Sequence, residues 1–476
     1  TLLRSQGTPG PGRFEVLSRM SEALALGGQV DSAWSTFGEA ARTLDRWSAT
    51  LRKREDSLAA LQDRIFDWDR DLGLATAVHR VAMGGRVPEA LAMAVWRRVR
   101  SKRQVALQRS AFAVTGTGTN RGVAQSGDST LLDARRLPVL ARARLAAGHA
   151  VVSYVVGRGG EPSVAFLLTR DTLRVFTMPP IDSLEPRIER FAGFVQAGRI
   201  VPALANELSD ALLAPILAAL PNATRRLIVV PDGVLHRLPF AALPHPSGEV
   251  VATHLELAIA PSVDDALGSA PVIARRSLAE YTARPLLVGT PRDMPRVPGT
   301  DRTWAALPGA RAEVRAVRDL LANATVIDGA AATLPTVAEA FASGGPVLHV
   351  ATHAVADPTS FERNGIILQA SGNDEGVFTL PALQATPLPF DLVVLSACAS
   401  GDGVLLAGQS LHGLVSTALD AGARGVVATR WRLDDEAIVP LMVALYRRLL
   451  MGDDAVAALH AVRREAIELG VSPAVW

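Results

Sequence analysis

The sequence predicts an α/β fold in which helices cover both faces of a largely parallel sheet, joined to an α-helical region at its start. After residue 130, short apolar runs alternate with amphipathic stretches, a pattern typical of strands that are buried on both faces. Before residue 110, apolar residues recur at helical spacing, as in Leu17, Met20 and Leu24. The chain has 476 residues, which is enough for two or three domains.

Residues 1–114 form the predicted helical region. Within it, the stretch LGGQVDSAWSTF at 26–37 is echoed by MGGRVPEALAMA at 83–94. In each stretch, a pair of glycines ends one helix and lets the next helix fold back against it. The two stretches resemble degenerate tetratricopeptide repeats, although their offset of 57 residues (27 to 84) exceeds the usual repeat of about 34. This resemblance implies a surface for a regulatory protein or ligand.

A basic stretch and then a linker follow the helices. The basic residues at 97–109 are Arg97, Arg98, Arg100, Lys102, Arg103 and Arg109. A nucleic acid or an acidic partner could bind there, but such a run is more often a solvated helix face. Residues 115–130, TGTGTNRGVAQSGDST, are polar, glycine-rich and aperiodic, which predicts a linker.

The remainder of the chain predicts strands that alternate with helices. Short apolar runs predict strands at 151–157, 164–169, 173–178, 227–233, 285–291, 325–327, 347–353, 391–398 and 425–431. Amphipathic stretches predict helices at 310–322, 333–343, 409–421, 434–450 and 453–469.

Net charge and cysteine content restrict the classes of function. A formal net charge of +2 provides no global field that would recruit a polyanion. Cys398 is the single cysteine, so the printed chain has no internal disulfide, which fits the reducing cytoplasm. No apolar run reaches the roughly 18 residues that a membrane span needs, and we predict no span. Because residue 1 is not Met, we expect the chain to be cut from a longer protein.

Two predicted strands end in residues with reactive side chains. The run VLHVAT leads into His353, and LVVLSA leads into Cys398, 45 residues later (353 to 398). If the two strands are parallel neighbours, both side chains emerge at the same edge of the sheet. A free cysteine with a pKa near 8.5 is only slightly ionised at neutral pH, and a nearby imidazole raises the thiolate fraction. This order and spacing predict a Cys-His dyad for nucleophilic catalysis.

Structural roles, a metal site and a serine hydrolase are the alternative interpretations of these residues. Taken singly, a cysteine at a strand end is usually a small buried hydrophobe, and a histidine there is usually structural. His349 and His353 form H-x-x-x-H on a strand without a third ligand, so we predict no metal site. The stretch GQSLHG at 408–413 departs from the G-x-S-x-G of serine hydrolases. His236 follows a strand-end turn in a half without cysteine, and we expect a structural role for it.

Several motifs together resemble the CHAT peptidases, relatives of caspases and separase. These are VLHVATHA, DLVVLSACASGDG and GLVSTALDAGARGVVATRWRLDDEA, with LIVVPDGVLHRLPFAAL at 227–243 and ALPGARAEVRAV at 306–317. The resemblance covers roughly 131–470. It implies a caspase-like three-layer α/β fold with two halves, a degenerate pseudo-peptidase half at 131–275 and a catalytic half at 276–476.

The resemblance implies a cysteine endopeptidase that needs no cofactor and acts on a protein or peptide, and it suggests bacterial defence or signalling. The backbone N–H groups of Cys398 and Ala354 are the expected oxyanion hole. The family commonly has Gly after this histidine, and Ala354 would be strained if its φ were positive. The alternative is a catalytically silent caspase-like interaction module in a signalling complex.

Asp434 and Asp435 follow the predicted strand at 425–431. As helix N-caps they would bond to backbone N–H groups. The resemblance to separase implies another role, in which an acidic group lines the pocket for a basic side chain before the scissile bond. Asp435 is the preferred contact under that interpretation.

Overall fold

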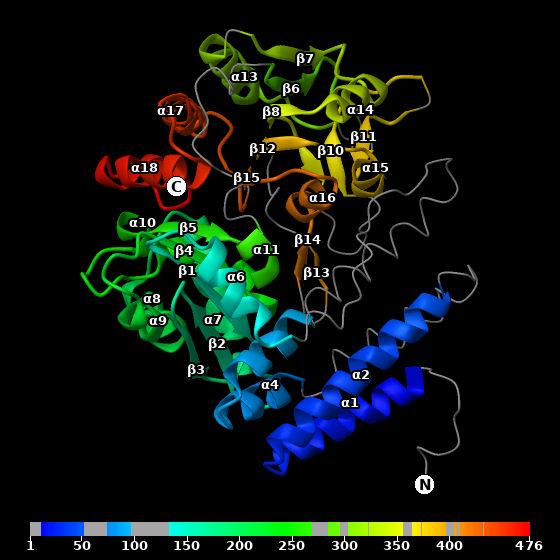
Figure 1. The fold of residues 1–476 in the computed structure, drawn as a ribbon. Helices are drawn as coiled ribbons and strands as arrows, with labels where there is room; N and C mark the ends of the chain where they lie inside the picture. The colour runs from blue at the N-terminus through cyan, green and yellow to red at the C-terminus, as the bar shows by residue number, and fades with distance from the viewer. Residues whose placement is uncertain are drawn as a thin grey trace.

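The computed structural model describes the greater part of the chain. The described residues are 11–51, 74–96, 133–268, 284–295, 303–321, 323–355, 364–372, 374–396, 404–406, 410–431 and 433–476. The described residues contain two five-stranded sheets. In the view of Figure 1 the second sheet is in the upper part of the molecule and the first in the lower part, with the N-terminal helices beside the first.

The N-terminal helices confirm the helical prediction over the part of 1–114 that is described. They are α1 (Pro11–Leu26), α2 (Val30–Leu51), α4 (Leu74–Met83) and a helix over 87–96. Gly28 and Gly85 have φ of 76° and 84°, and the residues that follow them donate to the carbonyls of Leu24 and Val81. The two glycine turns therefore share one C-cap geometry, the Schellman motif. The resemblance of these helices to tetratricopeptide repeats stays a prediction.

The first half contains a mixed sheet. Its order is β3 (Leu173–Met178), β2 (Ser163–Leu168), β1 (His149–Val155), β4 (Arg226–Val230) and β5 (Glu256–Ile259). β1, β2 and β3 run antiparallel, whereas β1, β4 and β5 run parallel. The prediction of a largely parallel sheet is wrong for this half, because the connections between β1, β2 and β3 are too short to cross over.

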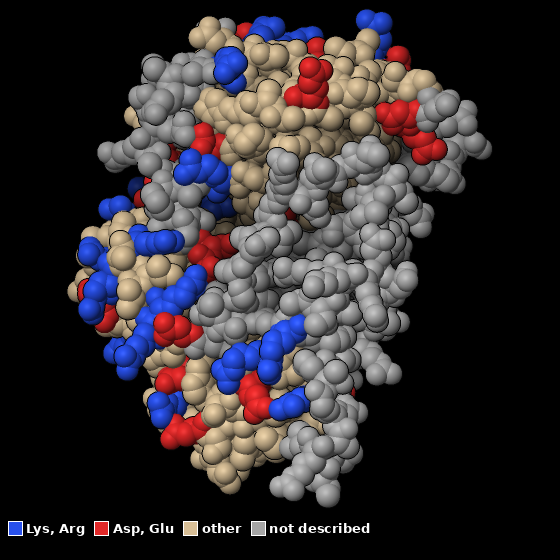
Figure 2. Space-filling model, turned by 45° about the vertical axis from the view of Figure 1, so that its right-hand side comes forward, with Lys and Arg blue, Asp and Glu red and all other residues tan. Residues whose placement is uncertain are grey.

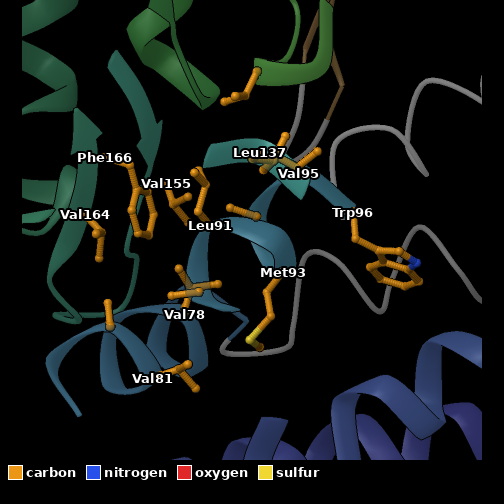
Figure 3. Packing of buried hydrophobic residues seen from close by; sticks show 14 of the residues in the cluster. Val78, Val81, Leu91, Met93, Val95, Trp96, Leu137, Val155, Val164 and Phe166 are labelled. Carbon is orange, nitrogen blue, oxygen red and sulfur yellow. The ribbon is translucent and has the colours of Figure 1, made fainter. Parts of the chain in front are cut away.

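Helices cover both faces of the first sheet. Val151, Val155 and Phe166 face the layer formed by the N-terminal helices, α6 (Arg136–Arg144) and α11 (Val263–Gly268), as Figure 3 shows for the packing around Leu91. The residues that alternate with these along the same strands lie on the opposite face of the sheet. They pack against α7 (Glu185–Gln196), α8 (Pro202–Leu212) and α9 (Ala214–Ala219). The N-terminal helices therefore share a hydrophobic core with the first half. The linker predicted at 115–130 lies outside the described residues.

The second half contains a fully parallel sheet. Its order is β15 (Val426–Ala428), β12 (Phe390–Leu395), β8 (Gly345–Val350), β6 (Leu286–Pro291) and β7 (Thr325–Gly329). One face packs against α13 (Pro308–Leu320) and α17 (Val439–Leu450). The other face packs against α14 (Leu334–Ser343), α15 (Leu380–Ala385) and α16 (Leu414–Asp420). These three layers confirm the predicted caspase-like α/β fold.

Two of the predicted helices begin later than the sequence suggested. Residues 410–412 are strand β14 (Ser410–His412), paired with β13 (Val404–Leu406). α16 begins only after Gly413, whose backbone is extended and whose N–H donates to the Ser416 hydroxyl. α17 begins at Val439, with Pro440 in its first turn, where the ring fits without loss of a hydrogen bond. The last helix, α18 (Ala455–Glu468), agrees with the prediction.

The described part of the chain has neither a face of one charge in the view of Figure 2 nor a helix suited to a membrane. Basic and acidic side chains are interspersed on the face seen in Figure 2. The basic stretch at 97–109 lies outside the described residues. In the described part of the chain, no helix combines the length and the apolar character that crossing a membrane requires.

Candidate active site

The strands that lead to His353 and Cys398 are parallel neighbours. β8 pairs with β12, with Leu348 opposite Val393 and Val350 opposite Leu395. The ladder continues one step further, because Ser396 N donates to Val350 O over 2.9 Å. The carboxyl ends of both strands therefore meet at one edge of the sheet, as the sequence predicts. Cys398 itself lies outside the described residues, two positions beyond Ser396.

His353 is held in a well-defined environment just after β8. Its side chain is buried, with 8% exposure. Its Nε2 lies 2.7 Å from the carbonyl oxygen of Ala305, and the Trp304 ring lies 5.0 Å away between centroids at an interplanar angle of 37°. Both contacts come from the segment that leads into α13.

The contact with Ala305 fixes the tautomer of the imidazole. A carbonyl oxygen only accepts, so Nε2 must carry the proton in this hydrogen bond. In the neutral ring, the lone pair then resides on Nδ1, which is the atom able to take a proton. The backbone of the same residue is also held, since Ile367 N donates to His353 O over 2.9 Å.

A buried polar cluster lies beneath the two strand ends. His349 of β8 and Glu313 of α13 are 0% and 1% exposed. Nε2 lies 3.2 Å from Oε1, close enough for electrostatic attraction but not aligned for a hydrogen bond. The hydroxyl of Ser396 donates to Oε2 of Glu313 over 2.9 Å. The ring of Tyr446 packs edge-on against His349, and burial together with the nearby Glu313 raises the pKa of Tyr446 well above its ordinary value. The cluster therefore joins α13 to both strands.

In the sequence, the H-x-x-x-H pattern suggests only a metal ligand at His349, and no motif indicates Glu313. The structure assigns His349 an acidic neighbour instead. A signal for Glu313 existed, because it is the lone acidic residue among the apolar positions of ALPGARAEVRAV at 306–317. Among the residues that the structure describes, no group of three or more His, Cys, Asp or Glu side chains is arranged to hold a metal ion.

Ala354 lies in β9 (Ala354–Val355), which pairs antiparallel with β10 (Gly365–Ile367). The strained positive φ considered for this residue does not occur, since Arg284 alone among the described non-glycine residues has one. Ile367 N donates to His353 O, so the alternation of an antiparallel ladder makes Ala354–Ile366 a pair without mutual hydrogen bonds. The Ala354 N–H therefore points away from β10.

The two aspartates after β15 bind backbone N–H groups. Asp434 accepts from the N–H groups of Glu436 and Ala437, within the turn before α17. Asp435 reaches a different helix: its carboxylate accepts from Gly309 N and Ala310 N in the first turn of α13. Asp435 thus caps α13 rather than its own helix. The pocket role of both residues stays a prediction.

The first half contributes contacts to the neighbourhood of this edge. His236 lies in the turn η5 (Gly233–Arg237) after β4, and its carbonyl accepts from Arg430, which follows β15, over 2.8 Å. Asp232 is buried and accepts from Val156 N over 2.9 Å. These contacts give the turn a structural role. The contact of His236 is made by its backbone, so the structural role expected of its side chain stays a prediction.

Three solved structures are similar to this chain, and the separase complex among them agrees with this architecture. Separase in its complex with securin from Saccharomyces cerevisiae is similar over 92% of this chain, with a TM-score of 0.56 and 8% identity. The chain spans 39% of that separase. The Arg-specific cysteine proteinase gingipain R matches 62% of this chain and 73% of its own, with a TM-score of 0.36 and 10% identity. The complex of RgpB pro- and mature domains from Porphyromonas gingivalis matches 61% and 74%, with a TM-score of 0.35 and 10% identity.

The comparison with curated proteins finds no match. The family model described as the CHAT domain matches residues 202–476, more than half of the sequence. This match includes β4, the whole second sheet and the strand ends described above. The chain therefore belongs to the CHAT domain family.

Proposed function

We propose that this protein is a cysteine endopeptidase whose nucleophile is Cys398 and whose base is His353. The observation that carries the proposal is the pairing of β8 with β12, which brings the strand end before His353 beside the strand end before Cys398. Membership of the CHAT family and the fixed imidazole of His353 support it.

The proposed reaction follows from the chemistry of these groups. His353 accepts the thiol proton, and the thiolate attacks the carbonyl carbon of the scissile peptide. The oxyanion that forms binds the backbone N–H groups of Cys398 and Ala354. The C–N bond then breaks as the imidazolium protonates the leaving amine, which leaves a thioester on Cys398. Water, deprotonated by His353, hydrolyses the thioester and restores the thiol.

A single experiment separates this enzyme from the silent interaction module. Since Cys398 is the only cysteine, iodoacetamide alkylation followed by intact mass spectrometry reports this thiol alone. We expect wild-type Cys398 to react at pH 6, below the reference thiol pKa of about 8.5. His353→Ala should shift the midpoint of the alkylation rate upward in pH. A wild-type midpoint near the reference value, unchanged in His353→Ala, would favour the silent module.

Turnover provides the second half of the test. Incubation with a library of internally quenched peptides should yield cleavage that Cys398→Ala abolishes without loss of fold. His353→Ala should lower turnover by about 10² to 10⁴-fold if proton transfer is its main role. Retained cleavage in Cys398→Ala would contradict the assignment of the nucleophile.

We also propose that a protein or ligand bound to the N-terminal helices controls the site, in bacterial defence or signalling in the cytoplasm. Trp96 contacts Phe37 of α2 edge-to-face at 5.2 Å, and the helix that carries Trp96 also packs against the first sheet (Figure 3). A bound partner would therefore act on a layer that shares a core with the first half.

A surface substitution on α1 tests this control. Val16 and Met20 lie one turn apart on α1 and are 43% and 38% exposed, so glutamate there should leave the fold intact. We expect lysate of the source cell to change the rate of peptide cleavage by wild type and not by Met20→Glu. Equal responses of the two proteins would count against control through α1.

A further inference from the structure

A buried charged residue joins the two strands that lead to the proposed dyad. Glu313 is 1% exposed, and its carboxylate contacts β8 through His349 Nε2 at 3.2 Å and the end of β12 through Ser396 Oγ at 2.9 Å. His349 precedes His353 by four residues, and Ser396 precedes Cys398 by two. One side chain therefore contacts both strands close to their functional ends.

This arrangement is not the one that stability alone would favour. The layer around Glu313 is apolar and contains Val314, Val317, Leu445 and Val347. Removing a carboxylate from water is costly, and a well-packed apolar residue in its place is often neutral or stabilising. Stability alone therefore does not explain why Glu313 is buried here. Buried polar clusters can fix the geometry of the groups that they contact, and this is a second reason for such a residue.

The same helix also contacts the base. α13 carries Glu313, and the segment that enters α13 supplies Ala305 and Trp304 to the His353 imidazole. Glu313 lies about one and a half turns after Pro308, the first residue of the helix. A shift of α13 relative to β12 would therefore change the position of the imidazole relative to the chain that continues to Cys398.

We infer that Glu313 is a positioning residue, which acts through Ser396 and His349 to hold the ends of β12 and β8 in the register that the Cys398–His353 pair requires. The inference rests on the proposed function. Without the carboxylate, the hydroxyl of Ser396 loses its acceptor, and the end of β12 loses its polar side-chain link to α13. A displacement of about 1 Å at a catalytic pair lowers rates by roughly 10²-fold.

The test compares four variants by the pH dependence of iodoacetamide alkylation of Cys398, which needs no knowledge of the substrate. Glu313→Leu removes the acceptor, and Glu313→Gln keeps an amide oxygen for Ser396. Ser396→Ala removes only the hydroxyl. Arg311→Met is the matched control, because Arg311 also joins α13 to the sheet, through Thr290 and the Pro291 carbonyl at the end of β6.

We expect the midpoint of alkylation to rise toward the reference thiol pKa of about 8.5 in Glu313→Leu and in Ser396→Ala. Glu313→Gln should lie between these variants and wild type. Arg311→Met should keep the wild-type midpoint, even where its melting temperature falls. If Glu313→Leu does not fold, Ser396→Ala still decides, because it deletes one atom from a half-buried side chain.

The outcomes separate this inference from the function on which it rests. A wild-type midpoint that responds to His353→Ala but is unchanged in both Ser396→Ala and Glu313→Leu would overturn the role of Glu313 alone. An equal rise in Arg311→Met would also overturn it, because any loosening of α13 would then have the same effect. A wild-type midpoint that does not respond to His353→Ala would overturn the proposed function and this inference with it.

Discussion

The imidazole of His353 is covered by an aromatic ring from a segment distant in the sequence. Trp304 lies 5.0 Å away between ring centroids, and its Nε1 is buried and has no hydrogen-bond partner within the described residues. The ring therefore acts on His353 through its face and its bulk rather than through its N–H group. Limiting the rotation of an imidazole keeps its ring oriented toward the group with which it exchanges a proton.

Substitution of Trp304 tests this role. Trp304→Phe keeps an aromatic cover and should retain most activity, whereas Trp304→Ala frees the imidazole and should lower kcat/KM by roughly 10-fold or more. The measurement is cleavage of one quenched peptide by each variant. Trp34, a partly buried residue of α2, supplies the control, and Trp34→Ala should leave kcat/KM unchanged. Equal activity in Trp304→Phe and Trp304→Ala would contradict the role of the ring.

Site residues that belong to a local motif could be predicted from the sequence, whereas those defined by long-range contacts could not. His353 follows a strand, and its position could be predicted from that strand alone. Glu313 is part of the site because it accepts a hydrogen bond from Ser396, 83 residues away. Ala305 is part of it because its carbonyl binds His353, 48 residues away. The backbone carbonyl of Ala305 carries no side-chain signal at all, so no pattern of residue types could reveal it.

The junction between α13 and the segment after β15 is the element on which the pocket prediction depends. Asp435 accepts from Gly309 N and Ala310 N, so both oxygens serve the first turn of α13. A Cβ at position 309 would lie 2.0 Å from the Asp435 carbonyl oxygen, which excludes any side chain there without a shift of the backbone. α13 therefore owes its position to this close contact as well as to its apolar face.

Two substitutions test the junction. Gly309→Ala should destabilise the protein because it separates Asp435 from the helix, and loss of such a cap costs about 1 kcal/mol or more. Gly193→Ala is the control, since Gly193 is inside α7, no atom lies within 4 Å of its added Cβ, and alanine favours helices by about 1 kcal/mol. Chemical denaturation should therefore give opposite signs for the two variants. A stabilising Gly309→Ala would contradict the geometry of the junction.

Asp435→Asn then examines the pocket proposal directly. Asparagine retains one acceptor for α13, so stability should fall by about 1 kcal/mol or less. If Asp435 also contacts a basic side chain of the substrate, the preference of the enzyme for Arg or Lys before the scissile bond should collapse. An unchanged cleavage preference in a folded Asp435→Asn protein would leave this residue with the capping role alone.

Among the elements, the strands agreed with the sequence better than the helix starts. β8 and β12 overlap the predicted runs at 347–353 and 391–398, because a buried parallel strand is apolar over its whole length, but both begin and end earlier than predicted. The helix predicted at 409–421 was wrong over 410–412, where the apolar spacing does not distinguish a strand from a helical turn. Gly413 then sets the true start of α16.

The arrangement of the whole molecule was the least accessible to sequence analysis. Alternating strands and helices suggested a largely parallel sheet, whereas the structure divides the strands into a mixed sheet and a parallel one. The packing of the N-terminal helices on the first sheet depends on pairs such as His79 and Thr177, which are 98 residues apart. Neither feature is encoded in any local period of the sequence.

A cluster of charges joins the two halves of the molecule. Arg226 of β4 donates to Glu256 of β5 over 2.6 Å and to both oxygens of Asp454 over 2.7 and 2.8 Å. Asp454 also caps α18, which belongs to the second half and lies beside β5 (Figure 1). His149 at the start of β1 lies next to this cluster, and its Nε2 accepts from Arg225 at 3.3 Å.

Stability should therefore depend on pH through His149. Burial first, then Arg226 and Arg225, lower its pKa from 6.5 to about 4, while Asp454 opposes the shift. Between pH 4 and pH 6.5, the unfolded chain binds a proton at His149 that the folded protein does not, so the free energy of unfolding rises with pH. The contribution is complete above pH 6.5 and is lost as the pH falls through this window.

His149→Gln removes the titration and keeps an acceptor for Arg225. We expect the free energy of unfolding, measured in urea between pH 4.5 and 7.5, to fall less steeply on acidification in this variant than in wild type. His254→Gln is the control, because His254 is a partly exposed surface histidine paired with Glu249. Its removal should not flatten the acid limb in the same way. Parallel curves for wild type and His149→Gln would show that the lowered pKa at the junction of the halves does not govern the acid sensitivity of the fold.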